Sequence, residues 1–368
     1  MRTKIGDICT LKSGTSLKDD VLNDREGIPY VKVSDMNLDG NEKYIVRSNS
    51  YANETISSKM LFPEGTILFP KRGGAIGTNK KRIASRMVCA DLNTMGVIPS
   101  EKIRPLFLYY YFQNIDFGTL YNGSSVPQIN NIDIAPMEIE LPSLDEQDNA
   151  IAVLEKVDCV IRKREEEIKE LDELIKARFV ELFGTTGKQV PLTDYVWFQE
   201  GPGVRSVDFT DEGTILLTGS NINDNTISFG YKSDRHISNE LASGKYAHFM
   251  CDKDDILVVS SAIDPDKFDK KVVVVDVDKK YCLNTGIIRF KPNKQYLTLG
   301  YFREFLKTDY FKHQVSSEMR GIAQMHFGPS HLKQMTILLP DSIERQVEFE
   351  TFVQQTDKSK FDCFIQPW

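Results

Sequence analysis

The sequence predicts a mixed α/β protein made of two repeated globular domains, separated by long coiled-coil-like helices in a pseudo-twofold repeat. Three observations lead to this prediction: an internal repeat, short β-branched runs inside each copy, and a seven-residue apolar period after the first copy. The chain has 368 residues, of which 40% are hydrophobic and 27% charged. That length and composition suit two or three folded domains.

Five collinear matches define the repeat. Residues 28–36 match 214–222, 61–69 match 250–258, 92–99 match 283–290, 107–112 match 301–305, and 139–147 match 337–346. Within each copy, short β-branched runs alternate with Gly, Asn and Asp clusters, which is typical of short strands joined by irregular loops. We therefore expect one globular domain over 1–143 and a second over 185–340.

A long helix is predicted between the copies, over 144–184. Apolar residues recur there at steps of seven: Leu154, Ile161, Ile168, Ile175 and Leu182. This spacing favours a helix-packing face of the coiled-coil type. Ser143 and Glu146 form a predicted capping box at its start, and Gly184 and Gly187 end it. At 1.5 Å per residue, the helix is expected to be roughly 60 Å long. A shorter second helix is expected within 341–368.

The composition excludes several classes of protein. A formal net charge of −7 excludes a general coating of nucleic acid, although it leaves room for a local basic patch. No apolar run approaches the ~20 residues of a membrane span and no signal peptide is evident, so a cytoplasmic protein is expected. Six scattered cysteines predict neither a disulfide framework nor a metal site.

The strongest binding signal is a stretch from 71 to 86 that contains no acidic residue. Its cations are Lys71, Arg72, Lys80, Lys81, Arg82 and Arg86. Three glycines lie between them, and glycine permits close approach of the backbone to phosphates. Arginine can also contact guanine with two hydrogen bonds. The stretch is interpreted as a DNA-binding loop, with a solvated surface loop as the alternative.

A polar segment in each copy is the second candidate for DNA contact. Its residues are Ser124, Gln128 and Asn130 in the first copy, and Arg320, Gln324 and His326 in the second. Side-chain amides suit the edge of adenine. An ordinary polar turn is the alternative.

Motifs for catalysis are weak. The sequence has no phosphate-binding loop, dinucleotide fingerprint or nucleophile turn. One nuclease-like pattern combines Asp266, Asp278 and Lys280, since paired carboxylates beside a lysine can hold a divalent cation. A solvated turn is the preferred interpretation.

Several motifs resemble those of the specificity subunits of type I restriction-modification systems. They are Ile28-Pro29-Tyr30-Val31, Gly65-Thr66-Ile67-Leu68 and Leu141-Pro142 to Gln147, with a weaker Leu339-Pro340 to Gln346 in the second copy. The resemblance implies that 1–143 and 185–340 are target recognition domains, each reading one half of a bipartite, asymmetric site in double-stranded DNA.

The resemblance also implies a division of labour. The helices would set the half-site spacing and dock two methyltransferase subunits, and restriction/translocase subunits would join the complex. This chain would be non-catalytic and bind no cofactor, because S-adenosylmethionine, ATP and Mg²⁺ would belong to the partner subunits. A bifunctional DNA-binding nuclease and a coiled-coil interaction protein remain the alternatives. The short C-terminal helix departs from the family pattern and leaves docking of the second methyltransferase open.

Overall fold

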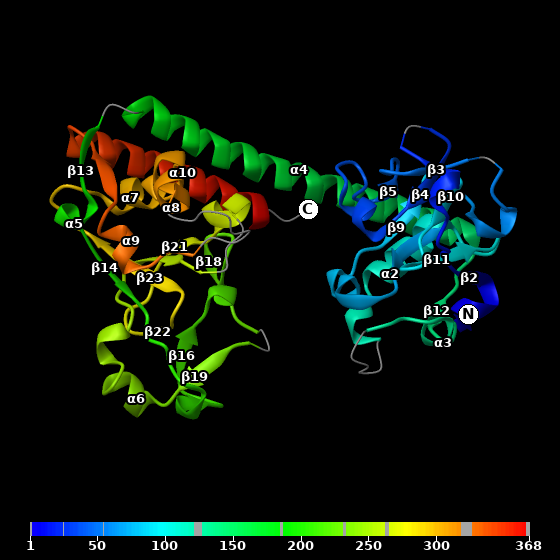
Figure 1. Ribbon diagram of the computed structural model, residues 1–368, viewed down its shortest axis with the longest axis horizontal. Helices are drawn as coiled ribbons and strands as arrows, with labels where there is room; N and C mark the ends of the chain where they lie inside the picture. The colour runs from blue at the N-terminus through cyan, green and yellow to red at the C-terminus, as the bar shows by residue number, and fades with distance from the viewer. Residues whose placement is uncertain are drawn as a thin grey trace. The chain divides into compact units, whose positions relative to one another are not determined.

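The computed structural model describes residues 2–24, 26–53, 55–120, 127–184, 187–230, 233–261, 265–317 and 326–365 (Figure 1). The chain divides into two compact units, Met1–Arg162 and Lys163–Trp368. Each unit contains one copy of the predicted repeat. The division falls inside α4 (Leu144–Phe183), a single helix of 40 residues. The predicted long helix is therefore present, and its two halves belong to different units.

Unit 1 is built on two five-stranded sheets and a two-stranded ribbon. The first sheet has the order β2 (Cys9–Ser13), β11 (Thr94–Pro99), β8 (Ile67–Pro70), β9 (Arg82–Ala84), β5 (Tyr44–Ile45). The second has the order β3 (Leu22–Asn23), β6 (Tyr51–Ala52), β4 (Ile28–Val31), β10 (Val88–Ala90), β7 (Leu61–Phe62). The ribbon pairs β1 (Arg2–Lys4) with β12 (Glu138–Glu140), and the helices besides α4 are α1 (Ile5–Ile8), α2 (Pro105–Gln113) and α3 (Asn131–Ile134).

Unit 2 repeats this plan. One sheet has the order β14 (Val196–Glu200), β23 (Ile287–Pro292), β20 (Ile256–Val259), β21 (Val272–Val274), and another has β15 (Phe209–Thr210), β19 (Arg235–Ile237), β16 (Thr214–Leu217), β22 (Tyr281–Leu283). Two ribbons pair β13 (Lys188–Pro191) with β24 (Thr336–Leu339) and β17 (Ile222–Asn223) with β18 (Thr226–Ile227). The helices are α5 (Leu192–Tyr195), α6 (Asn239–Ser243), α7 (Leu299–Phe305), α8 (Asp309–Ser317), α9 (Pro329–Leu332) and α10 (Ile343–Ile365).

The strand registers confirm the internal repeat. In each unit an antiparallel pair opens the main sheet, with Cys9 opposite Pro99 in one and Val196 opposite Pro292 in the other. Each unit also contains a corresponding parallel pair, β4 with β10 and β16 with β22, and unit 1 has a second parallel pair, β5 with β9. A duplicated mixed α/β domain is therefore the fold, as the sequence predicts.

The start of α4 is fixed by side-chain caps. Ser143 and Glu146 form the predicted capping box. The Ser143 hydroxyl lies 2.7 Å from the Glu146 carboxylate, and the Glu146 amide donates to the Ser143 Oγ. Gln147, which is fully buried, accepts from the amide of Arg104 at 2.8 Å and donates to the carbonyls of Lys102 and Pro142. The glutamine therefore joins the helix start to the loop before α2.

The same connection recurs in unit 2. Gln346 is buried and accepts from the amide of Thr298 at 2.9 Å, and it donates to the carbonyl of Tyr296. The glutamine is the last residue of the Leu-Pro motif in both copies, and this hydrogen-bonding role is the physical reason for its presence there. An aspartate follows eleven residues later in both copies, three helical turns along the same face.

Those aspartates form the second connection between helix and domain. Asp158 accepts from the Tyr110 hydroxyl at 2.6 Å and from the Lys43 amine at 3.2 Å. Asp357 accepts from Arg303 at 3.2 Å, in unit 2. Each helix is thus held to its own globular domain at two points.

Within unit 2, α10 runs alongside the second half of α4 (Figure 1). Phe349 packs against Phe179 and Phe183, with ring centroids 5.5 and 5.6 Å apart. Further along α10, the Lys360 amine lies 2.7 Å from the Asp172 carboxylate of α4. The contacts therefore extend over 172–183 of α4. Among the described helices, none combines the length and the apolar character that a bilayer span requires.

Candidate nucleic-acid interface

The basic stretch 71–86 leaves the main sheet of unit 1 at the end of β8 and returns to it at β9. Between them lies a 3₁₀ turn, Gly73–Thr78, whose first residue has a φ of +72°. Only glycine adopts that conformation without strain. Gly74 and Gly77 lie in open space, where an added Cβ would meet nothing within 4 Å. Glycine at these two positions is therefore not required by packing within the fold.

Lys81 is not at the surface, and the prediction that it contacts DNA is wrong. The side chain is fully buried, and its amine donates to the Asn79 side-chain oxygen at 2.6 Å and to the Ile115 carbonyl at 2.7 Å. The amine also lies 4.4 Å from the centre of the Phe117 ring. Burial lowers the pKa of Lys81 to about 8. The charge therefore ties the stretch to the loop after α2.

Arg82 and Lys80 are also engaged inside the domain. The Arg82 guanidinium donates to the backbone carbonyls of Lys81 and Met36, at 2.9 and 3.1 Å. The Lys80 amine contacts the Asn37 side chain.

The second copy repeats the Lys80 contact. At the matching position of unit 2, Lys271 donates to the Asn223 side chain at 2.7 Å and to the Ile222 carbonyl at 2.8 Å. Because both copies make this contact, the lysine is a structural residue of the repeat. Of the six predicted cations, Arg72 and Arg86 are exposed, Lys71, Lys80 and Arg82 are partly exposed, and Lys81 is buried.

The two segments that the sequence singles out separately lie side by side in unit 1. Arg72 and Gln128 form an antiparallel bridge. The Gly73 amide donates to the Pro127 carbonyl at 2.8 Å, and the Ile129 amide donates to the Lys71 carbonyl at 2.9 Å. We call the surface formed by Lys71, Arg72, Gln128 and Asn130 the unit 1 edge.

Side-chain chemistry makes the unit 1 edge suitable for an anion. The Lys71 amine lies 2.8 Å from the Ser13 hydroxyl. Its pKa is lowered, first by partial burial and next by the charge of the neighbouring Arg72. A phosphate beside this pair would relieve that repulsion. Gln128 donates to the Asn130 side-chain oxygen at 2.7 Å, which holds the two amides together at the same edge.

Three residues of the second polar candidate, Ser124, Arg320 and Gln324, lie outside the described residues. His326 is described and is exposed, just before the buried Phe327. The structure therefore brings Gln128 and Asn130 to the same place as the basic stretch and places His326 in the other unit.

The nuclease-like residues lie in a loop region of unit 2. The Asp278 carboxylate accepts from the Lys253 amide at 3.2 Å, and the Lys280 amine lies 5.3 Å from the centre of the Tyr281 ring. The Asp266 side chain lies outside the described part of the chain. Within that part, no cluster of three His, Cys, Asp or Glu residues is placed to hold a metal ion.

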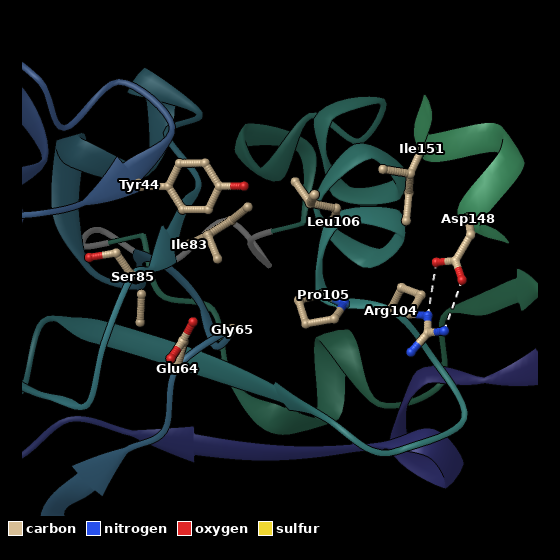
Figure 2. Close-up of a pocket in the computed structure, with 11 residues that line it drawn as sticks. Tyr44, Glu64, Gly65, Ile83, Ser85, Arg104, Pro105, Leu106, Asp148 and Ile151 are labelled. Atoms are coloured by element: carbon tan, nitrogen blue, oxygen red, sulfur yellow. Dashed lines mark hydrogen bonds and ion pairs between the residues drawn. The ribbon is translucent and has the colours of Figure 1, made fainter. Parts of the chain in front are cut away.

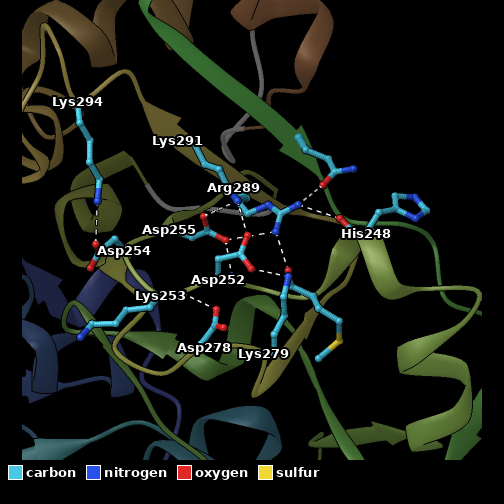
Figure 3. A network of polar contacts seen from close by, with 12 residues as sticks. His248, Asp252, Lys253, Asp254, Asp255, Asp278, Lys279, Arg289, Lys291 and Lys294 are labelled. Atoms are coloured by element: carbon cyan, nitrogen blue, oxygen red, sulfur yellow. Dashed lines mark hydrogen bonds and ion pairs between the residues drawn. The ribbon is translucent and has the colours of Figure 1, made fainter.

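Nearby carboxylates are instead neutralised by basic residues (Figure 3). Arg289 is buried and donates to the Asp255 carboxylate at 3.2 Å and to the Met250 carbonyl at 2.7 Å. Asp252 pairs with both Lys279 and Lys291, and these contacts lower its pKa to about 2. The network is a structural support of the sheet.

The predicted helix-packing residues divide into two groups. Ile175 is buried, and Ile168 and Leu182 are partly buried, all in the half of α4 that belongs to unit 2. Leu154 and Ile161, in unit 1, are exposed, Ile161 to 47%. For these two residues, the helix-packing role stays a prediction.

Two valines extend the exposed part of α4. Val153 is 60% exposed and Val160 36% exposed. Val153 and Val160 are seven residues apart, as are Leu154 and Ile161, so the four side chains lie in two adjacent rows on one broad side of the helix. We call these four residues the α4 stripe. Scattered apolar residues are common on surfaces, but a continuous stripe indicates a contact surface.

A cavity of about 570 Å³ lies beside α2 and α4 (Figure 2), and Gly65 of the Gly65-Thr66-Ile67-Leu68 motif is among its lining residues. Ile83, Leu106 and Ile151 form its apolar lining. Arg104 and Asp148 stand at its rim in a two-fold hydrogen-bonded ion pair, at 2.9 and 2.8 Å. These residues are far apart in the sequence, and only the folded helix brings them together.

Comparison with known proteins agrees with this architecture. Residues 1–172 and 188–363 match the model of the type I restriction modification DNA specificity domain. A curated relative, the specificity subunit of the type I restriction enzyme MjaIX from Methanocaldococcus jannaschii, is 27% identical over 165 residues. That match spans 42% of this chain and 36% of the relative, about a third of its length.

A solved structure shares the fold over nearly the whole chain. It is the S subunit of a type I restriction-modification system from M. genitalium, with 14% identity and a TM-score of 0.50. The likeness covers 99% of this chain and 90% of that one. The comparisons give no support to the nuclease alternative. The two family matches, one for each copy of the repeat, show that the chain belongs to the type I restriction-modification DNA specificity family and carries its domain twice.

Proposed function

We propose that this chain is the DNA-recognition subunit of a type I restriction-modification complex in the cytoplasm. Each domain reads one half of a bipartite, asymmetric site in double-stranded DNA, and α4 sets the spacing of the halves. The observation that carries the proposal is the duplication of a DNA specificity domain, over 1–172 and 188–363, in one chain. The chain performs no catalytic step. Methyl transfer and cleavage belong to partner subunits, which bind S-adenosylmethionine, ATP and Mg²⁺.

Phosphate contacts from the unit 1 edge supply part of the affinity. Each neutralised phosphate contributes about 0.9 to the slope of log K against log salt. We expect Lys71→Ala, in the complex with the methyltransferase, to reduce that slope by about 0.9 on a duplex that contains the methylated site. Lys59→Ala, which removes an exposed lysine elsewhere in unit 1, is the control and should leave the slope unchanged. An unchanged slope in Lys71→Ala would remove this residue from the interface.

The α4 stripe is the surface that we propose for docking of a methyltransferase subunit. Double replacement of Val153 and Val160 by Glu should abolish co-purification of the methyltransferase with the chain, because it places two charges in an apolar contact. Folding should be unaffected, since both side chains are exposed. Val180→Glu is the control: Val180 is 65% exposed on the same helix but lies on a different face. Retention of the methyltransferase by the double variant would show that it docks elsewhere.

A further inference from the structure

The hydrogen bond that builds the unit 1 edge has a counterpart in unit 2. In unit 1 the Ile129 amide donates to the Lys71 carbonyl, and in unit 2 the Phe327 amide donates to the Ser260 carbonyl, both at 2.9 Å. Ile129 and Phe327 are both fully buried. The segment returning to the sheet therefore docks on the same strand end, β8 or β20, in both copies.

The residues that follow fix the register of this correspondence. The Asn130 amide donates to the Asp133 side chain at 2.7 Å, and the Gly328 amide donates to His331 Nδ1 at 3.0 Å. Both contacts link a residue to the one three positions later, at the start of a short helix. Gln128 therefore corresponds to His326, and not to Gln324.

The sheet register shows which residues correspond just beyond the ends of β8 and β20. Val97 lies opposite Ile67 in unit 1, and Phe290 lies opposite Ile256 in unit 2. Counting five residues along from Ile67 and from Ile256 places Arg72 and Ser261 at equivalent positions.

The unit 1 edge and the corresponding surface of unit 2 thus have different side chains at two equivalent positions. Unit 1 presents an exposed guanidinium, Arg72, beside the amide of Gln128. Unit 2 presents the hydroxyl of Ser261, partly buried, and the exposed imidazole of His326. Arginine and glutamine form paired hydrogen bonds with guanine and adenine respectively, whereas serine and histidine have shorter and less selective polar groups. Different residues on an equivalent scaffold are what two different half-sites require.

The turn beside this surface also differs between the two units. In unit 1 the turn is Gly73–Thr78, and its Gly77 lies in open space. In unit 2 the turn at this place is Pro265–Lys270, in which Asp269 pairs with Lys176 and Lys312. The unit 1 turn is therefore free for close approach of a ligand to its backbone, whereas the unit 2 turn is bound to its own domain.

We propose that these two positions, Arg72 with Gln128 in unit 1 and Ser261 with His326 in unit 2, determine the base sequence of the two half-sites. The inference rests on the proposed function and deepens it, because it assigns one half-site to each pair of residues.

An exchange of the pairs tests the inference in the assembled methyltransferase complex. The variants are Arg72→Ser with Gln128→His, and Ser261→Arg with His326→Gln. Binding is measured by fluorescence anisotropy on duplexes that carry the wild-type methylated site with one base pair changed at a time. The first variant should alter the preference for at least one base pair of one half-site by about tenfold or more and leave the other half-site within twofold. The second variant should do the converse.

A matched control and a separate readout keep the outcomes distinct. Lys59→Ser with Gln113→His removes the same charge and amide from exposed positions of unit 1 and should leave every preference unchanged. Wild-type preferences at both half-sites in the exchanged variants, with the complex assembled, would overturn the inference. Failure of the wild-type complex to prefer any bipartite site would overturn the proposed function itself.

Discussion

Replacing Gln147 by alanine tests the connection between α4 and its domain. Gln147 is fully buried and makes three hydrogen bonds, one from the Arg104 amide and two to backbone carbonyls. Alanine would leave all three backbone groups without this partner, at about 1 kcal/mol each. We therefore expect Gln147→Ala to lower the free energy of unfolding of unit 1 by about 3 kcal/mol. With a urea dependence of about 2 kcal/mol per molar, the midpoint should fall by roughly 1.5 M.

The assay uses two probes because the chain has two units. Far-UV circular dichroism reports on both units, whereas both tryptophans of the chain, Trp197 and Trp368, belong to unit 2. Gln147→Ala should shift a transition seen by circular dichroism and leave the tryptophan transition in place. Gln346→Ala, which loses two hydrogen bonds in unit 2, should shift the tryptophan transition by about 2 kcal/mol.

Asn149→Ala provides the matched control, because it removes an exposed amide two residues further along the same helix. Its effect should stay within about 0.5 kcal/mol. A destabilisation by Gln147→Ala of less than that, or one equal to the control, would refute the argument that the buried glutamine fixes the helix start.

Two further predictions concern charged groups. Below pH 8 Lys81 is charged in both the folded and the unfolded chain, whereas between pH 8 and its ordinary pKa of 10.5 only the unfolded chain keeps the proton. The free energy of unfolding should therefore rise over this pH range by up to about 3 kcal/mol relative to Lys81→Met, as measured by urea titration. Parallel pH profiles for the wild type and the variant would contradict the buried charge. Asp252 has a folded pKa of about 2, so its ion pairs stabilise unit 2 above pH 3.8 and are lost as the pH falls toward 2. Asp252→Asn should lower the free energy of unfolding of unit 2, monitored by tryptophan fluorescence at pH 7, by about 1 kcal/mol. The control Asp276→Asn, at an exposed site, should have no measurable effect. Equal effects of the two variants would show that the network contributes no stability.

Features that depend on residues close together in the sequence were predicted correctly. The Ser143–Glu146 capping box depends on residues three apart, and it is present as predicted. The repeat could also be predicted, because each copy buries corresponding strands with matching apolar runs. The role of Gln147 could not be predicted, since its partner Arg104 lies 43 residues away in the sequence.

The basic stretch shows the limit of reading charge along the sequence. Six cations in one stretch indicate a phosphate contact, yet Lys81 is buried over Phe117 and Lys80 is held by Asn37. The repeat contained one signal that would have corrected this. Lys271 stands at the position of Lys80 in the second copy, in a segment that also contains Asp266 and Asp269, and a residue kept in both copies is better explained by a shared structural contact.

The heptad pattern predicted the long helix correctly and did not specify what covers its apolar face. The seven-residue period marks one apolar side along α4, and that side is buried at Ile175 but exposed at Ile161. Apolar periodicity predicts that a face is buried in something. It does not say whether the covering surface belongs to the same chain.

The most direct test of the central claim is a genome-wide methylation map of cells that express this chain with the methyltransferase of its complex. The account predicts one methylated motif made of two different half-sites separated by a spacer of fixed length, lost when the chain is absent. A palindromic or uninterrupted motif, or no new methylation by an assembled complex, would contradict it.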